Sequence, residues 1–489
     1  MLRPPIRGPI LALCLAPFLG GGVGAQEVSG LPAARAMEEV LVDVIARCEK
    51  SVVAIARVRK DRTGETLGLE LRPDPFGRRV VAPTPQQPTD PDFIPNEYGT
   101  GVVIDRAGLI LTAYHVLGED SDYYVTTHDR KVYRAWIKAA DPRSDLAVLA
   151  VEAYNLVPIT FGDATGLRKG RWVIALGNPY AIARDGQVSA SWGMVSNLAR
   201  KAPPTPNDFS STGKPTLHHF GTLIQTDAKL NLGTSGGPLL NLDGEMIGLT
   251  VALAATAGYE QAAGYAIPVD TTFRRVVETL RTGREVEYGF LGIIPIGLRP
   301  EEILGGQQGI RVDRIVPGTP AARYGLKVDD VVTTVAGRPI YEPDGLVLEV
   351  GRLPVEAVAP IGVIRNGRKQ TIEVTLAKYP VLGKKIVSNR PEPWRGLRVD
   401  YPSALVDPDG RAHGGMVFYD DGVIVTEVLP ATPAWQAGLR RGMRISHVGR
   451  TPVRTPKEFL AAVADESGGV QLRLADDDTN PVRTVTAGS

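Results

Sequence analysis

An internal repeat near the C-terminus is the feature that most constrains how this chain of 489 residues folds. Nine positions recur with the same residue at a constant offset of 113. In each copy, a Pro-x-Thr-Pro-Ala segment typical of a helix start precedes a Gly-Leu pair typical of a helix end. The repeat therefore predicts two successive copies of one small domain. The paired positions are Gly309 and Gly422, Pro317 and Pro430, Thr319 and Thr432, Pro320 and Pro433, Ala321 and Ala434, Gly325 and Gly438, Leu326 and Leu439, Val335 and Val448, and Pro339 and Pro452.

The region from Gly99 to Pro268 has a different pattern, in which short apolar runs are separated by Gly, Asp and Asn. Many short strands with turn residues between them predict an all-β barrel or sandwich. Ahead of this region we expect a helix over residues 34–50 and a strand over Val52–Val58. Residues 61–96 hold seven prolines and no steady period, which predicts a long exposed loop or insertion. The stretch 201–216, rich in Pro and Ser, is predicted as another loop.

The N-terminus has the pattern of an export signal. Arg3 and Arg7 precede a short apolar run. Small residues follow this run up to Ala25, and we expect cleavage after Ala25. The alternative is an uncleaved membrane anchor, although the apolar run is short for a transmembrane helix. Cleavage would leave Cys48 as the one cysteine, so the mature chain would have no internal disulfide.

The formal net charge of the chain is +1, which argues against electrostatic binding to nucleic acid. The six histidines show no spacing typical of a zinc site, and there is no cysteine cluster. Adjacent His218 and His219 are interpreted as a loop pair. We therefore expect no metal, no cofactor and no nucleic-acid partner.

A glycine-rich run, Gly233–Pro238, surrounds Ser235. Peptide hydrolysis needs an activated nucleophile and donors for the developing oxyanion. A glycine-rich turn exposes a serine hydroxyl and lets backbone N–H groups converge, so we expect the amides of Gly233 and Ser235 to form an oxyanion hole. The alternative is a purely structural hairpin.

Two further residues favour catalysis over the structural alternative. His115 follows an apolar run, and Asp145 precedes another. The order His, Asp, Ser, with gaps of 30 and 90 residues, fits a two-barrel serine protease in which the first barrel carries the base and the acid. Either residue alone would be interpreted as structural.

Segments spread over Tyr98–Pro268 together resemble the HtrA/DegP family of trypsin-like proteases. The resemblance implies that His115 is the general base, that Asp145 orients it, and that Ser235 forms an acyl-enzyme. It rests on the joint order of Gly99–Ile104, Leu111–Val116, Ser144–Leu149, Leu176–Pro179, Ile224–Ala228, Ser235–Leu239, Asp243–Gly248 and Gly264–Pro268.

Four positions depart from the family pattern. Thr234 stands where Asn is usual, Leu232 where Pro or Arg is usual, and Tyr114 where Asn or Ala is usual. The hydroxyl of Thr234 can still hold the turn. Lys229 stands where a small residue is usual, beside Leu230 at the expected wall of the primary specificity pocket. A lysine inside the pocket would change the cleavage preference, whereas a lysine that points to solvent would not.

The two repeats resemble PDZ domains, which bind an extended peptide at a sheet edge and hold its terminal carboxylate with backbone amides. The resemblance places the carboxylate loop of the first copy at Tyr288, Gly289, Phe290, Leu291 and Gly292. In the second copy the loop would be Trp394–Leu397, and residues 402–419 form an insertion. Alternatively, either copy docks on the protease and binds no peptide.

These expectations combine into one mostly β architecture, a two-barrel chymotrypsin-like protease domain followed by two α+β PDZ domains. The expected divisions are a signal peptide at 1–25, an N-terminal helix and strand at 26–60, a Pro-rich loop at 61–97, the remaining protease domain at 98–283, and PDZ domains at 286–380 and 392–487.

The resemblance implies a serine endopeptidase, periplasmic or secreted, that degrades misfolded or damaged exported proteins. It also implies regulation by peptide C-termini bound to the PDZ domains, and a homotrimer or larger assembly. The alternatives are a chaperone or peptide-binding scaffold with dispensable catalysis, and a structural adaptor.

Overall fold

The structure is a computed structural model, and it describes residues 30–59, 97–178, 187–201, 216–251, 264–380, 386–405, 422–464, 466–475, 479 and 481–487, with the backbone of 67–73 and 79–85. The expected signal segment and most of the expected loop 201–216 lie outside these residues. No described helix is both long enough and apolar enough to cross a membrane.

The first barrel is a closed sheet in the order β7-β6-β1-β4-β5-β8, in which β8 pairs back with β7. Every side chain of β8 is buried, as its unbroken apolar sequence requires. The strands are β1 (Val52–Arg59), β4 (Glu97–Val103), β5 (Leu109–Ala113), β6 (Ser121–Thr126), β7 (Val132–Asp141) and β8 (Leu146–Val151).

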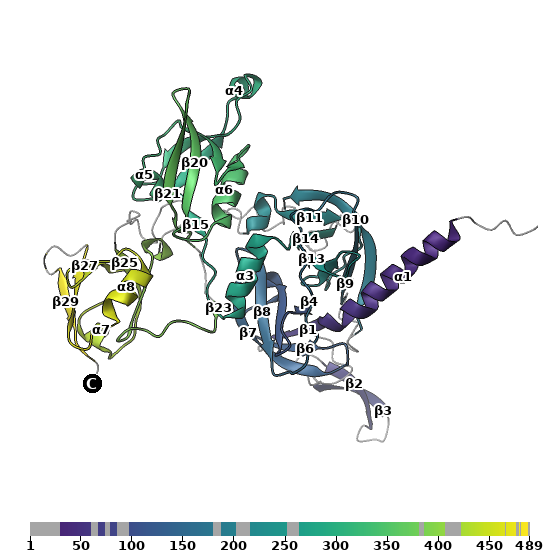
Figure 1. The fold of residues 1–489 in the computed structure, drawn as a ribbon. Helices are drawn as coiled ribbons and strands as arrows, with labels where there is room; N and C mark the ends of the chain where they lie inside the picture. The colour runs from purple at the N-terminus through teal and green to yellow at the C-terminus, as the bar shows by residue number, and fades with distance from the viewer. Residues whose placement is uncertain are drawn as a thin grey trace, which may run out of the picture.

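The second barrel closes in the order β10-β11-β14-β13-β12-β9. Helix α3 (Thr271–Arg281) follows it and packs its apolar face against β7 and β8 of the first barrel (Figure 1). The strands are β9 (Trp172–Gly177), β10 (Ser189–Arg200), β11 (Leu223–Thr226), β12 (Pro238–Leu240), β13 (Met246–Val251) and β14 (Gly264–Pro268). The expected two-barrel architecture is confirmed.

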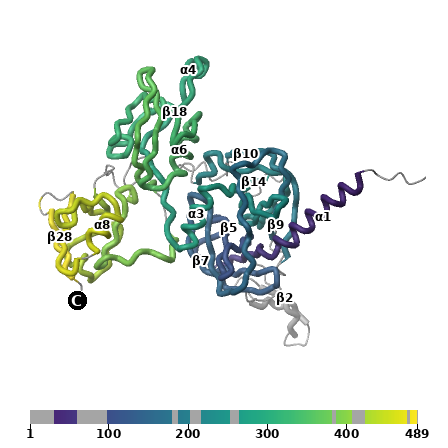
Figure 2. Tube along the Cα trace, viewed as in Figure 1, coloured from purple at the N-terminus to yellow at the C-terminus, as the bar shows by residue number. Residues whose placement is uncertain are grey.

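The N-terminal helix α1 (Leu31–Cys48) projects from the barrels on the side opposite the two repeats (Figures 1 and 2). Among the described residues of this helix, Val44 and Cys48 near its C-terminal end are the ones that are buried. The single turn η1 (Glu49–Ser51) links it to β1. Helix and strand lie close to the ranges expected from the sequence.

The proline-rich segment differs from the sequence expectation because it contains a β-hairpin. Strands β2 (Leu67–Pro73) and β3 (Arg79–Pro85) pair with each other in an antiparallel register. Among the described strands, β2 and β3 pair only with each other, so the N–H groups that their prolines lack are not needed for a second ladder. The prolines had favoured a loop because they remove donors that a central strand would need.

The repeats form two sheets with corresponding strand orders, β16-β17-β18-β20-β21 and β24-β25-β26-β28-β29. Each sheet also has a two-residue strand that pairs with its third strand: β19 (Arg338–Pro339) pairs with β18, and β27 (Thr451–Pro452) pairs with β26. The first set is β16 (Ile293–Gly297), β17 (Ile310–Ile315), β18 (Val331–Val335), β20 (Val358–Arg365) and β21 (Arg368–Thr375). The second set is β24 (Leu397–Asp400), β25 (Val423–Val428), β26 (Arg444–Val448), β28 (Val470–Leu474) and β29 (Val482–Val485).

The helices of the repeats also correspond. The short helices α5 (Pro320–Arg323) and α7 (Pro433–Gln436) each begin with proline, and Gly325 and Gly438 follow them with φ near +80°. The longer helices α6 (Pro343–Arg352) and α8 (Pro456–Val463) each cover one sheet. Helix α4 (Pro300–Leu304) has no described counterpart in the second repeat. The predicted duplication is therefore confirmed.

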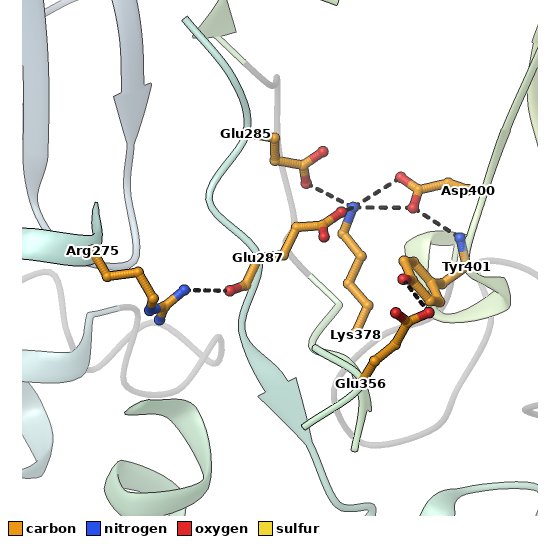
Figure 3. Close-up of polar contacts among 7 residues, drawn as sticks. All are labelled: Arg275, Glu285, Glu287, Glu356, Lys378, Asp400 and Tyr401. Atoms are coloured by element: carbon orange, nitrogen blue, oxygen red, sulfur yellow. Dashed lines mark hydrogen bonds and ion pairs between the residues drawn. The ribbon is translucent and has the colours of Figure 1, made fainter. Parts of the chain in front are cut away.

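A buried lysine joins three parts of the chain (Figure 3). Lys378, in β22 (Ala377–Lys378) at the end of the first repeat, is 3% exposed and contacts Glu285, Glu287 and Asp400 at 3.1, 2.9 and 3.0 Å. The two glutamates lie in the linker ahead of the first repeat, and Asp400 ends the first strand of the second. We call these four residues the Lys378 cluster.

Candidate active site

His115 and Asp145 meet at one end of the first barrel. His115 lies in the single turn η3 (Tyr114–Val116) that directly follows β5. Its Nδ1 is 2.8 Å from Asp145 Oδ2, and its backbone N–H donates to Asp145 Oδ1 at 3.0 Å. The histidine side chain is 35% exposed while that of Asp145 is 7% exposed. The carboxylate thus fixes the ring from the buried side and leaves the other face open.

The electrostatics of this pair suit a general base. Burial alone would lower the pKa of His115, but the charge of Asp145 and its hydrogen bond raise that pKa above the ordinary value. Burial alone would raise the pKa of Asp145, but the charge and hydrogen bonds of His115 hold it below its ordinary value. A charged Asp145 therefore stabilises the imidazolium that forms when His115 takes a proton.

The turn that presents Asp145 is held by hydrogen bonds to Ser144, the residue directly before it. Asp145 is a non-glycine residue with φ of +54°, a conformation that costs energy and needs support. Asp141 Oδ2 accepts from the backbone N–H and the hydroxyl of Ser144 at 3.0 and 2.5 Å. On the other side, His218 Nε2 is 2.8 Å from the carbonyl oxygen of Ser144.

His218 lies in a loop, as interpreted from the sequence, but its side chain is buried there. It lies in the turn η5 (Leu217–Phe220), is buried, and its Nδ1 is 2.7 Å from Thr222 Oγ1. Burial lowers its pKa despite the nearby charge of Asp145. A neutral His218 thus joins the loop between β10 and β11 to the Asp145 turn. The sequence did not indicate that His218 is buried, because it lies in a His-His pair within a polar stretch that has no hydrophobic periodicity.

Ser235 lies in a turn whose glycines are required by the backbone. Gly233 and Gly236 have φ of +92° and +88°. A Cβ on Gly236 would lie 2.1 Å from the Thr100 carbonyl oxygen and 3.2 Å from the Ala113 amide nitrogen. Ala113 ends β5, two residues before His115, so the turn lies close to this histidine. The backbone carbonyl of Ser235 accepts from the Thr100 N–H at 2.9 Å.

A buried threonine joins the two barrels next to this turn. The hydroxyl of Thr100, on β4, donates to the Gly233 carbonyl at 2.7 Å and accepts from the Asn178 N–H at 2.9 Å. Thr100 lies in the Gly99–Ile104 motif, but nothing in the sequence indicates that its hydroxyl fixes Gly233. Thr234 Oγ1 donates to the Asn231 carbonyl at 2.7 Å, so this residue does hold the turn.

The expected oxyanion donors lie on this seated turn. The amide of Gly233 donates to no residue that the structure describes. A Cβ at this position would lie 2.5 Å from the Asn178 carbonyl oxygen and 2.6 Å from the Tyr98 ring. Glycine is therefore needed at 233 for both conformation and space.

The residues at the expected pocket wall differ in how much of each is exposed to solvent. Lys229 is exposed and its carbonyl accepts from the Ser191 hydroxyl at 3.1 Å, whereas Leu230 is half-buried. Leu232 is 41% exposed. The placement of Lys229 fits the alternative in which its side chain points to solvent.

The residues of the expected peptide loop in the first repeat lie in two different surroundings: some lead into a strand, and others are packed between domains. Leu291 and Gly292 lead directly into β16, which pairs only with β17 among the described strands. Tyr288 is fully buried and its hydroxyl donates to Asp141 of the protease barrel, so it does not contribute its side chain to a peptide site. Phe290 is 8% exposed, and its ring meets Tyr379 edge-on at 6.0 Å. Phe290 ends the short strand β15 (Gly289–Phe290), and Tyr288 directly precedes this strand. Both side chains are packed between domains.

The corresponding loop of the second repeat is also partly buried. The ring of Trp394 meets Phe459 edge-on with 5.8 Å between centroids. The Gly396 carbonyl accepts from the Leu429 N–H at 2.8 Å. Most of the expected insertion 402–419 lies outside the described residues. No cluster of possible metal ligands occurs among the residues that the structure describes.

Comparison with known proteins matches the same three regions. Residues 99–249 match the family of trypsin-like peptidase domains, and residues 289–376 and 424–475 each match a PDZ domain family. The periplasmic serine endoprotease DegP of Salmonella typhimurium is 30% identical over 388 residues, covering 78% of this chain and 75% of that protein. A probable periplasmic DegP-like serine endoprotease of Halomonas elongata is 29% identical over 473 residues, 93% of each chain.

Solved structures that resemble this chain are also HtrA-type proteases. The HtrA-type protease AlgW with a decapeptide superimposes with a TM-score of 0.51 at 26% identity, covering 69% of this chain and 98% of that one. The same protease with a tripeptide gives a TM-score of 0.52 at 25% identity, covering 69% and 97%.

Proposed function

The chain belongs to the HtrA/DegP family of serine endoproteases and is a serine-type endopeptidase, and from that premise we propose that it degrades misfolded or damaged exported proteins through Ser235, His115 and Asp145. The observation that carries the proposal is the His115–Asp145 contact at 2.8 Å, next to the glycine-rich turn of Ser235. A structural turn would need neither a raised histidine pKa nor a buried carboxylate partner.

The proposed reaction begins when His115 Nε2 takes the proton of Ser235 Oγ as that oxygen attacks the scissile carbonyl carbon. The amides of Gly233 and Ser235 stabilise the oxyanion of the tetrahedral intermediate. His115 then protonates the leaving amine, and the C–N bond breaks to give an acyl-enzyme. Water deacylates the enzyme by the same steps, with His115 as its base.

We also propose that the first PDZ domain binds peptide C-termini along β16. Support comes from the unpaired edge of β16 in the described part of the sheet, and from the amides of Leu291 and Gly292 at its start. The neighbour AlgW was solved with a decapeptide and with a tripeptide. Peptide bound at β16 would regulate cleavage at Ser235. For the second PDZ domain, peptide binding and simple docking remain equal alternatives.

The proposed location is the periplasm, after cleavage behind Ala25. The relatives are named periplasmic, which supports this location. We propose a homotrimer or larger assembly built through the N-terminal region. Exposed apolar side chains on α1, at Leu31, Val40 and Val42, support a partner for this helix.

The test of the proposed function compares the mature protein with Ser235→Ala on unfolded casein. We expect the parent to degrade casein and Ser235→Ala to be inactive but normally folded, as measured by circular dichroism. Equal activity of both proteins would contradict the proposal. If both proteins are inactive with C-terminal peptides added, while Ser235→Ala suppresses casein aggregation, the chaperone alternative replaces it.

A further inference from the structure

The turn that carries Asp145 is held from outside the two barrels. Asp141, the last residue of β7, is 4% exposed, and its Oδ2 receives three donors. Two come from Ser144, one residue before Asp145, and the third is the hydroxyl of Tyr288. Tyr288 lies 147 positions further along the chain, in the linker to the first PDZ domain.

Tyr288 is itself fixed by several contacts. Its ring lies 5.3 Å from the guanidinium of Arg143 and 5.5 Å from that of Arg275. Its backbone carbonyl accepts from the Tyr379 N–H at 2.7 Å. Burial and the Asp141 carboxylate both raise its pKa well above the ordinary value, so the hydroxyl stays protonated and can donate to Asp141.

The same edge of β7 carries a second external contact. Strand β23 (Ile386–Val387), which follows the first PDZ domain, pairs with Ala139 and Ala140 immediately before Asp141. Arg143, inside the turn, lies 3.5 Å from the centroid of the Tyr379 ring. Segments on both sides of the first PDZ domain therefore converge on the turn between β7 and β8.

This convergence matters because Asp145 has little freedom of its own. Its φ of +54° is unfavourable for a residue with a side chain, and both of its carboxylate oxygens must meet His115. Ser144 transmits the position of Asp141 to Asp145 through the backbone. An error of about 1 Å in the placement of a catalytic group can cost a large factor in rate.

We propose that Tyr288 is a positioning residue for the reaction, whose hydroxyl holds Asp141 and thereby sets the orientation of Asp145 toward His115. The proposal rests on the triad proposed above. It gives Tyr288 a role in the chemical step in place of the peptide contact expected from the sequence. The titratable groups that interact with Asp145 are His115 and Tyr114 on η3 and His218 on η5.

The test uses the full mature protein and the variant Tyr288→Phe, which removes one oxygen and keeps the ring. With a fluorogenic peptide substrate, we expect kcat to fall roughly fivefold, the effect of one hydrogen bond, with KM unchanged. Because a displaced Asp145 raises the pKa of His115 less, the acid limb of the kcat/KM profile should move to lower pH.

The matched control is Tyr401→Phe. Tyr401 also donates its hydroxyl to a carboxylate between domains, that of Glu356 at 3.0 Å, but it does not touch the 141–145 turn. This variant should keep both kcat and the acid limb of the parent. The double variant Tyr288→Phe/Asp141→Asn should lose no more activity than Asp141→Asn alone, because Tyr288 acts through Asp141.

The outcomes separate this proposal from the proposed function. An active Ser235→Ala protein would reject the triad and this proposal together. If Ser235→Ala is inactive while Tyr288→Phe keeps the parental kcat and acid limb, only the positioning role is rejected. A change in KM alone, or a lower melting temperature with unchanged kcat, also rejects it.

Discussion

At the scale of single residues, the site depends on a carboxylate held in an unfavourable backbone conformation. Asp145 uses both oxygens on His115, and Asp141 on one side and His218 on the other hold the residue before it. His115, Asp145 and Ser235 could be predicted from their order and their neighbours. The roles of Asp141 and His218 could not, because Asp141 accepts from Tyr288, 147 positions away, and His218 contacts Ser144, 74 positions away.

The pH profile tests the His115–Asp145 contact. The proposed mechanism needs neutral His115, and Asp145 raises its pKa above 6.5, so kcat/KM should rise with pH through an apparent pKa above 6.5. Asp145→Asn keeps the shape but removes the charge. We expect kcat to fall roughly 10³- to 10⁴-fold, with the residual acid limb moved to lower pH. A parental profile for Asp145→Asn would contradict the assigned role.

At the scale of elements, the sequence predicted the helices and strands that bury an apolar face, and those that are repeated along the chain. The repeat and the strands around the triad were predicted for this reason. The hairpin β2–β3 was missed because prolines suppress a strand signal, although an edge pair tolerates them. Strand β23 has only two residues and exists because β7 offers it an edge, which no local sequence signal reveals.

Helix α3 offers a test at this scale. Its N-cap residue Asp270 accepts from the Phe273 N–H at 2.8 Å and lies 3.9 Å from Arg352 of the first PDZ domain. Asp270→Ala should lower the free energy of unfolding by about 1 kcal/mol, whereas Asp270→Asn should cost only a few tenths, since asparagine is an equally good cap. Calorimetry of the two variants measures the difference. Equal losses would assign the effect to the Arg352 contact.

At the scale of the whole molecule, the Lys378 cluster connects both PDZ domains to the linker that carries Tyr288. Burial alone would lower the pKa of Lys378, but the charges of Asp400, Glu285 and Glu287 raise it, so the lysine stays charged. Its three carboxylate partners come from segments that no sequence periodicity relates. A buried ion pair is costly to break because the remaining charges lose their partner.

Lys378→Met should therefore release the second PDZ domain from the rest of the chain. The loss of a buried partner costs roughly 3–5 kcal/mol, enough to separate docked domains. Small-angle scattering should show a larger radius of gyration than for the parent. Lys369→Met, an exposed lysine on β21 of the same domain, is the control and should leave the scattering unchanged. Identical scattering of both variants would show that the cluster does not hold the domains.

The central claim is that Ser235 is the nucleophile activated by His115, and covalent labelling tests it most directly. The mature protein is treated with a fluorophosphonate, which phosphonylates an activated serine, and the modified residue is located by peptide mass mapping. We predict one adduct, on Ser235, which is absent from Ser235→Ala and strongly slowed in His115→Ala. Casein degradation without an adduct on Ser235, or with the adduct on another residue, would contradict the account.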